Sequence, residues 1–546
     1  MILRLSKSMG GVAAILLLSA CTKIANYAEK RADRAAYGNI EWSQRNALGS
    51  AAPFTIDDEE AQRIRALLER DNQEEDAKLL SLADALAIAM ANSRSYQTRK
   101  ESLFIEALNL TKVQKDFNVT YAGSAYASGS SSSLKDGTTE TFGDNGLDSG
   151  LDLAVKKTLA TGAKVTLAFS QNTLSYFTDT DVADVNNALS LSIVQPLLNG
   201  FGPLVTKEPL RQAERDMIYA VRDFKRYQQN FVIEITSEYY SVLRSKDQLS
   251  NERKNYESSI ANREQSESFA RAGRIADFEA AQARQSELNA ADSWIVSQSD
   301  YQTKLDGFRF SLGLPIDLDV EPNPLELRSL EQRGLVDVGI TLDEALLSAS
   351  SNRLDLINQR EQVEDKVRKL EIERRNFLPN LGVTYDVKKP FSNGTDVSHN
   401  LRVDLNLPFD WTEKRNSYRI AQISLDREQR SLEEDESDVL RRVRDLWRKL
   451  ERNRSVYNNR LLSVKLSMRR VENTELLLQQ GKALQRDYLD AKDDLLSSQN
   501  AATVALVDYT INRLRFWDAI ERFEIDPRGM WYEQEDGNSK ETVETP

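Results

Sequence analysis

The sequence predicts a mostly α-helical protein with a smaller β-sheet part and an internal two-fold repeat. Three observations support this prediction. The chain has 546 residues but only 12 prolines and 23 glycines, which indicates long uninterrupted elements, most of them helices. The same helix-opening pattern occurs twice, at Ser81 and at Thr341. After each copy, apolar and polar residues alternate with period two, which is typical of strands.

Charge and composition argue against several classes of function. The formal net charge is -13, and an acidic protein repels the phosphates of nucleic acid, so we expect no nucleic-acid partner. His399 is the only histidine, which argues against a histidine-based metal or catalytic site, and we expect no cofactor. Cys21 is the only cysteine, so a disulfide within one chain is impossible.

Residues 1–20 have the pattern of a signal peptide. Arg4 and Lys7 precede the apolar run "GGVAAILLLS", which is too short to span a bilayer as a helix. The run ends in "LSAC", which resembles a bacterial lipobox and would make Cys21 the lipidated, palmitate-bearing N-terminus. The alternative is an ordinary secretory signal followed by a chance cysteine. With a lipobox, residues 21–78 would be a lipid-anchored extension. Thr22 stands where an Asp often signals retention in the inner membrane, so it favours the outer membrane.

Each copy of the repeat opens with a predicted helix. Ser81 and Thr341 are good N-cap residues, and an acid stands three positions after each of them, which is the capping-box pattern or close to it. The helices are predicted over residues 82–117 and 342–377, without a glycine or proline, at about 36 residues or about 54 Å each. Pro379 ends the second one.

Strands are predicted next. The second copy has alternating segments at 381–387 and 401–409, and the first copy has them at 119–128 and 188–198. The first copy also contains an extra hairpin at 151–170, around a Thr161-Gly162 turn. Alternation of this kind suits a half-buried strand of a soluble sheet as well as a barrel strand between lipid and a lumen. The sequence leaves open whether the extra hairpin joins the same sheet.

Two very long helices follow the strands. They are predicted over residues 205–272 and 412–480, at about 68 residues or about 100 Å each. Both have a narrow apolar seam, which a simple two-stranded coiled coil would also explain. The seam residues align between the copies: Val232, Ile235, Tyr239 and Val242 with Leu440, Val443, Trp447 and Leu450. The long helices end at tip turns with Gly273 and Gly481, and return helices are predicted over 278–312 and 488–523.

This order of elements, with "QPLLNGFG" or "LPF" before the long helices, resembles the TolC-like outer-membrane efflux protein family, specifically its lipid-anchored members. The resemblance covers Leu79 to Asp526. It implies a first efflux-protein repeat at 79–319, an equatorial linker at 320–340, a second repeat at 341–526 and a disordered tail at 527–546. It further implies a homotrimer with a long α-helical tunnel and one shared transmembrane β-barrel. Four strands per chain could not close a useful barrel alone, and lipid excludes an open sheet edge.

The resemblance also implies function and partners. The protein would be a passive export duct in the outer membrane, not an enzyme, working with a periplasmic adaptor protein and an inner-membrane pump of the RND or ABC type. Outer-membrane lipid would surround it. The alternative is a periplasmic coiled-coil adaptor or structural lipoprotein without a pore. An enzyme is not supported, because the sequence contains no nucleophile elbow, metal-ligand cluster or phosphate-binding loop.

In the family, aspartates one helical turn apart ring the periplasmic end of the pore. Asp487 and Asp490 match them, and Asp277 matches the acid of the first repeat. A ring of carboxylates would attract cations and repel anions. The alternative is that Asp487 is a helix N-cap and Asp490 its N3 acid. Leu478 and Ala483 replace the family's tyrosine and arginine that tie the closed tip, so another contact, involving Lys482 or Arg486, would be needed.

Overall fold

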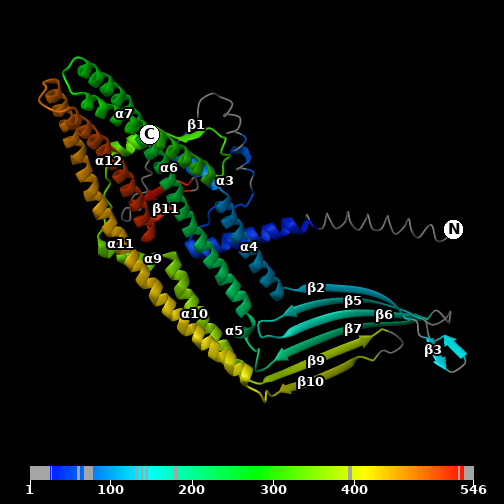
Figure 1. Cartoon of the computed structure of the whole chain (residues 1–546). Coiled ribbons are helices and arrows are strands. Elements are labelled where there is room, and N and C mark those ends of the chain that lie inside the picture. Colours follow the sequence, from blue (N-terminus) through cyan, green and yellow to red (C-terminus); the bar gives the residue numbers. More distant parts are fainter. Residues whose placement is uncertain are drawn as a thin grey trace, which may run out of the picture. The chain divides into compact units, whose positions relative to one another are not determined.

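The structure is a computed structural model that describes residues 25–533, apart from gaps at 26, 58, 60–61, 65, 67–77, 131–132, 137–138, 143–145, 177–182, 392–395 and 527–528. Figure 1 shows the chain. The predicted signal peptide, Cys21 and residues 534–546 lie outside the described residues. The chain divides into two compact units: one from 1–51, 103–221 and 359–432, and one from 52–102, 222–358 and 433–546.

Long helices dominate the secondary structure (Figure 1). Residues 27–48 and 62–64 are helical as well. The other helices of the described residues are α3 (Leu82–Asn92), α4 (Arg94–Phe117), α5 (Pro203–Thr206), α6 (Glu208–Arg271), α7 (Asp277–Ser311), α8 (Pro324–Arg333), α9 (Leu342–Asn352), α10 (Leu354–Arg375), α11 (Thr412–Gln479) and α12 (Gln485–Ala519). Helices α6 and α11 have 64 and 68 residues, which confirms the two long helices that the sequence predicts.

The opening helix of each copy is interrupted, so the prediction of two continuous helices is wrong. The breaks fall at equivalent places, Ser93 between α3 and α4 and Arg353 between α9 and α10. Both residues have extended backbone angles, with ψ of 126° and 122°. At the first break, the carbonyl oxygen of Asn92 lies beside Gly313, where a Cβ would come within 2.1 Å of it. A sequence without Gly or Pro at these points does not reveal such an approach.

One six-stranded antiparallel sheet lies in the first unit, in the order β10-β9-β7-β6-β5-β2 (Figure 1). Its strands are β2 (Thr120–Ser130), β5 (Gly146–Thr158), β6 (Lys164–Tyr176), β7 (Ala183–Pro196), β9 (Asn380–Pro390) and β10 (Ser398–Asn406). Four of them, β2, β7, β9 and β10, are the strands predicted from the two copies of the repeat. The other two, β5 and β6, are the predicted extra hairpin. The hairpin, β5 and β6, lies inside the sheet between β2 and β7, which answers the question that the sequence leaves open.

Short strand pairs complete the fold. They are β1 (Lys78–Leu80) with β8 (Val320–Pro322), β3 (Ser133–Asp136) with β4 (Thr139–Phe142), and β11 (Phe523–Ile525) with β12 (Trp531–Glu533). Strand β12 falls in the segment predicted as a disordered tail from residue 527, so that prediction is wrong for these three residues. Gly529, at φ +89°, lies against Met90 and Leu86, and this contact explains the order there.

The core of the second unit forms along the predicted seam. On α6, all four seam residues, Val232 to Val242, are buried. On α11, Val443 and Leu450 are buried, but Val439 takes the place predicted for Leu440, which is half-buried. Apolar residues of α3, α7, α9 and α12 belong to the same cluster. The seam of α6 is therefore part of a multi-helix core, as a long helix with one apolar stripe requires.

Candidate functional site

The two tip turns have the same backbone geometry. Gly273 and Gly481 adopt φ of +68° and +71°, in the left-handed region that favours glycine. After α6, the amide of Arg274 donates to the carbonyl of Phe269 at 2.9 Å, and after α11, the amide of Lys482 donates to the carbonyl of Leu477 at 2.8 Å. The amides of Gly273 and Gly481 also donate hydrogen bonds, to the carbonyls of Ala270 and Leu478. Each pair of bonds forms a Schellman motif. Each turn therefore ends a long helix at a defined residue.

Gly481→Ala is expected to destabilise its turn by about 1–2 kcal/mol, because an L-residue resists positive φ. A Cβ at this position would meet no atom within 4 Å, so the effect would come from the backbone alone. Hydrogen exchange of the Lys482 amide should become faster. Gly307→Ala, in the interior of α7 and equally free of contacts, is the matched control and should leave this exchange unchanged. Equal effects of the two substitutions would contradict the prediction.

Asp487 and Asp490 both lie exposed on the first turns of α12. Helix α12 begins at Gln485, one turn before the predicted start, so Leu484 is the N-cap and Asp487 is at N3. A carboxylate oxygen of Asp487 accepts a hydrogen bond from the Leu484 amide at 3.2 Å. The alternative prediction that Asp487 is an N-cap is therefore wrong in position, although the residue does stabilise the helix start. Tyr488 and Leu489 between the aspartates are buried, which leaves both carboxylates on the solvent side.

Arg486 forms an ion pair with the second of these acids. Its guanidinium lies 3.6 Å from the carboxylate of Asp490, four residues on. Further along the same helix, burial and the charges of Asp490 and Asp494 raise the pKa of Asp493. The start of α12 is thus an acidic surface of four aspartates that is partly neutralised by its own chain.

Asp277 is the first residue of α7, and its side chain is exposed. In the described residues, no hydrogen bond or ion pair joins it to Asp487 or Asp490. The matching positions of the two repeats therefore differ: Asp277 is at N1 of its helix, whereas Asp487 is at N3.

The six-stranded sheet has one apolar face and one polar face. The registers place Tyr121, Val155, Leu167, Leu191 and Val387 in one row across five strands. The neighbouring row on the same face contains Leu153, Phe169 and Leu189 and ends on β9 at Lys389. On the other face, the matching row is polar: Thr120, Lys156, Thr166, Ser192, Asp386 and Asn400. This two-sided pattern suits a wall between lipid and water.

The apolar face is open to solvent in the single chain. Leu153 is 49 % exposed, and Leu401 and Val403 of the edge strand β10 are 68 % and 62 % exposed. Contiguous exposed apolar surface of this kind marks an interaction with lipid or protein. His399 ends the first apolar row, where its Nδ1 lies 2.9 Å from the hydroxyl of Tyr385.

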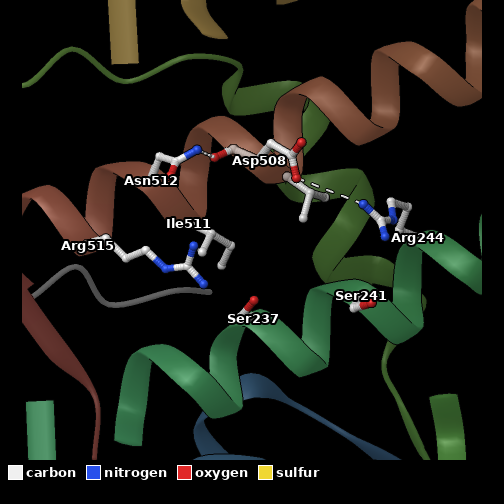
Figure 2. Close-up of a pocket in the computed structure, with 8 residues that line it drawn as sticks. Ser237, Ser241, Arg244, Asp508, Ile511, Asn512 and Arg515 are labelled. Carbon is white, nitrogen blue, oxygen red and sulfur yellow. Dashed lines mark hydrogen bonds and ion pairs between the residues drawn. The ribbon is translucent and has the colours of Figure 1, made fainter. Parts of the chain in front are cut away.

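A polar cavity of about 230 Å³ lies between α6 and α12 (Figure 2). Ser237, Ser241 and Arg244 line it from α6, and Figure 2 shows Arg244 facing Asp508 of α12 at 3.9 Å. Asn512 and Arg515 complete the polar lining. The lining contains serines but no histidine or lysine that could activate one of them as a nucleophile.

A buried charge cluster joins α6 to the end of α12. Arg226 donates to Glu521 at 2.6 Å and lies 3.6 Å from both Asp518 and Asp355. Burial raises the pKa of Asp518 to about 6, against the opposing charge of Arg226. Arg353, at the break between α9 and α10, pairs with Asp355 at 2.5 Å and donates to the carbonyl of Ala519. The sequence reading misses this cluster, since charged residues on long helices usually face solvent.

Two general features of the described residues bear on function. No group of three or more His, Cys, Asp and Glu side chains is arranged there to hold a metal ion. None of the described helices contains an apolar stretch of the length that a bilayer crossing requires.

Comparison with known proteins gives a fold but no sequence relative. No protein-family model matches the chain, and no curated protein matches it either. The structure is similar to the Campylobacter jejuni CmeC outer membrane channel, at 15 % identity and a TM-score of 0.60, over 86 % of this chain and 89 % of that one. It is also similar to the outer membrane protein VceC of Vibrio cholerae, at 13 % identity and a TM-score of 0.60, over 80 % of this chain and 95 % of that one.

A third similar structure is the open state of the Neisseria gonorrhoeae MtrE outer membrane channel, at 14 % identity and a TM-score of 0.58, over 80 % of this chain and 88 % of that one. The chain therefore has the fold of these three outer-membrane proteins.

Proposed function

We propose that the chain is a TolC-like outer-membrane channel-tunnel of a tripartite efflux or type I secretion system. It would be a passive duct across the periplasm and outer membrane, without enzymatic activity. The observation that carries this proposal is the channel fold, found over four-fifths or more of the chain. The apolar face of the six-stranded sheet supports it independently, because a wall between lipid and water needs such a face.

A homotrimer is part of the proposal. Among the described residues of one chain, β2 and β10 are the edges of the sheet, and no further strand lies beside their outer backbone groups. In hydrocarbon, unpaired backbone groups are too costly, so the edges must pair with other copies to close a barrel. The helices would form the periplasmic tunnel of the same trimer, following the two repeats at 79–319 and 341–526 on either side of the linker at 320–340.

The proposed periplasmic gate is a ring of Asp487 and Asp490 from three chains, with Asp277 at the tips of the first repeats. The exposure of all three carboxylates supports this role. Arg486 pairs with Asp490 within the same helix, so it would partly neutralise this ring, and Lys482 or Arg486 would need to reach another chain to replace the family's tyrosine and arginine. Contact with a periplasmic adaptor protein and an inner-membrane pump of the RND or ABC type would open it. Cys21, after a signal peptide at 1–20, would carry the lipid anchor in the outer membrane.

Asp487→Ala combined with Asp490→Ala is expected to raise single-channel conductance and to reduce cation preference in planar bilayers. The reason is that the double change removes six carboxylates from the narrowest part of the trimeric pore. Conductance and reversal potential in a salt gradient measure both effects. The matched control is Asp343→Ala, an exposed acid in the first turn of α9, which should change neither.

Two results would contradict different parts of the proposal. Unchanged selectivity in the double variant would remove these aspartates from the constriction. Absence of any conductance from purified wild-type protein would favour the second candidate, a periplasmic coiled-coil adaptor or structural lipoprotein without a pore. That candidate explains the long helices, but it gives no role to the exposed apolar face of the sheet.

A further inference from the structure

We propose that the barrel of this protein has eighteen strands, six from each chain, and that it passes polymeric solutes about 2 nm across. This inference rests on the proposed function, since it assumes a trimeric barrel. It depends on the β5–β6 hairpin, which could either form part of the barrel wall or fold away from it.

The hairpin is a full member of the sheet. Strands β5 and β6 have 13 residues each, between the 11 of β2 and the 14 of β7 beside them. β5 pairs with β2 from Thr120 opposite Lys156 to Ser130 opposite Gly146, and β6 pairs with β7 over a similar length. A hairpin that folded over the end or the face of the sheet would leave β2 next to β7. The hairpin instead separates those two strands along their whole length.

The side chains of the hairpin follow the two faces of the sheet. Leu153 and Val155 of β5 share apolar rows with Phe169 and Leu167 of β6, and β7 continues both rows with Leu189 and Leu191. Asp152 and Lys156 lie on the opposite, polar face. Strand register specifies which face each residue occupies, and a shift by one residue would exchange the two faces. Lys157, next to the turn of the hairpin, is the one charged residue of β5 on the apolar side. The hairpin is therefore patterned for the same environment as the other four strands.

Tyr126 of β2 fixes the hairpin on the polar face. Its ring lies over Gly150 of β5, where a Cβ would come within 2.3 Å of the ring, and its hydroxyl reaches Asn172 of β6 at 3.4 Å. The side chain thus spans the strand beside it. Glycine at position 150 is what allows this crossing, because any larger side chain would displace the ring.

The turn of the hairpin is held as well. The carbonyl of Thr161 accepts hydrogen bonds from the amide of Gly202 at 3.1 Å and from the side chain of Gln195 at 3.2 Å. Gly162, at φ +92°, lies so close to the carbonyl of Gly200 that a Cβ would be 2.5 Å from that oxygen. The turn of the hairpin is therefore hydrogen-bonded to the end of β7 and to the segment that follows it, in addition to the backbone bonds between the strands.

The edges of the sheet allow closure with six strands per chain. Because every neighbour in the sheet is antiparallel, β10 at one edge and β2 at the other run in opposite directions. When β10 of one copy lies beside β2 of the next, the antiparallel order continues through three copies. The barrel then has eighteen strands and no free edge.

Strand number sets the bore. With strands about 4.8 Å apart and tilted by about 40°, eighteen strands give a backbone diameter of about 36 Å, and twelve give about 24 Å. Side chains on the inner face remove about 10 Å of this. The free bore is then about 26 Å instead of about 14 Å, which admits two α-helices side by side instead of one. The barrel would thus admit bulky polymers such as polypeptide hairpins, once the open gate has let them through.

Polymer exclusion in planar bilayers tests the bore. Polyethylene glycols of increasing size are added at the barrel side, and the largest size that lowers conductance by entering is recorded. We expect entry of polymers up to about 12 Å in radius for the wild type. Deletion of residues 131–182 joins β2 directly to β7 at the same end of the sheet and keeps four antiparallel strands. This variant should exclude polymers above about 7 Å in radius.

The matched control replaces residues 131–145 by an Asn-Gly turn. It removes β3 and β4 but keeps the β5–β6 hairpin, since Ser130 and Gly146 are already partners, and it should retain the wide limit. A wild-type limit near 7 Å would overturn the proposal even if the deletion variant does not fold. Conducting channels with that narrow limit would refute only the strand number, whereas no conductance at all would refute the proposed function.

A cysteine pair gives a second test, independent of conductance. Ala125 of β2 and Leu151 of β5 are direct partners, and Cys21 is the only natural cysteine. Ala125→Cys with Leu151→Cys in the full chain should form an intrachain disulfide in outer membranes. Ala125→Cys with Leu189→Cys of β7 should not. Crosslinking of the second pair alone would show that β2 lies next to β7 and would overturn the proposal.

Discussion

Replacement of Arg226 by methionine is expected to lower the free energy of unfolding by about 3–5 kcal/mol, because it leaves buried carboxylates without their counter-charge. Arg226 contacts Glu521 at 2.6 Å and Asp518 at 3.6 Å, and all three side chains are about nine-tenths buried, at 11 %, 9 % and 10 % exposure. Methionine keeps much of the length of the arginine stem, so most of the effect would be electrostatic. Urea-induced unfolding of the full chain in detergent, followed by circular dichroism, measures it.

The effect should depend on pH through Asp518. Its pKa of about 6 lies above the ordinary 3.8, so between these values the folded chain holds a proton that the unfolded chain has lost. This residue therefore favours the fold at low pH, and the contribution is lost as the pH rises through 6. At pH 5 the Asp518 carboxyl is mostly protonated and needs little counter-charge, whereas at pH 7 it is ionised. The destabilisation caused by Arg226→Met should therefore be smaller at pH 5 than at pH 7.

Asp518→Asn is the control for this explanation. It cannot titrate, so stability should fall less between pH 5 and pH 7 than in the wild type, by about 1 kcal/mol. Combined with Arg226→Met, it should recover part of the lost stability at pH 7. If the double variant were no more stable than Arg226→Met alone, charge would not be the cause, and lost packing of the arginine stem would explain the effect instead.

Gly313→Ala is expected to destabilise the fold by about 2–5 kcal/mol, from backbone strain at positive φ together with a steric overlap. Gly313 has φ of +73°, and a Cβ there would lie 2.1 Å from the carbonyl oxygen of Asn92. The neighbouring atom is backbone at the break between α3 and α4, so it cannot move as a flexible side chain would. The same urea-induced unfolding measures the loss.

Gly334→Ala separates the two causes. Gly334 ends α8 with φ of +67°, but a Cβ there would meet nothing within 4 Å. It should therefore lose only the strain of about 1–2 kcal/mol. Similar losses in the two variants would show that the approach of Gly313 to Asn92 contributes nothing.

Much of this fold could be predicted from local sequence signals. Gly273 and Gly481 end the long helices where predicted, since a glycine after an unbroken helical pattern has a specific backbone role. Period-two alternation located every strand of the large sheet to within several residues. In both cases the signal and the structure depend on neighbours in the chain.

The failures come from contacts between distant segments. The breaks at Ser93 and Arg353 occur inside good helical sequence, and at each of them a residue from far along the chain, Gly313 or Ala519, lies close. The buried cluster around Arg226 is hidden for the same reason. For the candidate gate, the acidic pair was predicted, but the start of α12 at Gln485 and the pairing of Arg486 with Asp490 required the structure.

The alternating strand directions limit how such a sheet can change in size. Insertion of a single strand would make the two edge strands run the same way, so neighbouring copies would meet with parallel edges. A hairpin is therefore the smallest insertion that leaves the contact between copies unaltered, and in a trimer each hairpin would add six strands to the circumference. The width of such a duct can evolve, or be engineered, only in discrete steps, and each step leaves the helices and the contacts between subunits as they were.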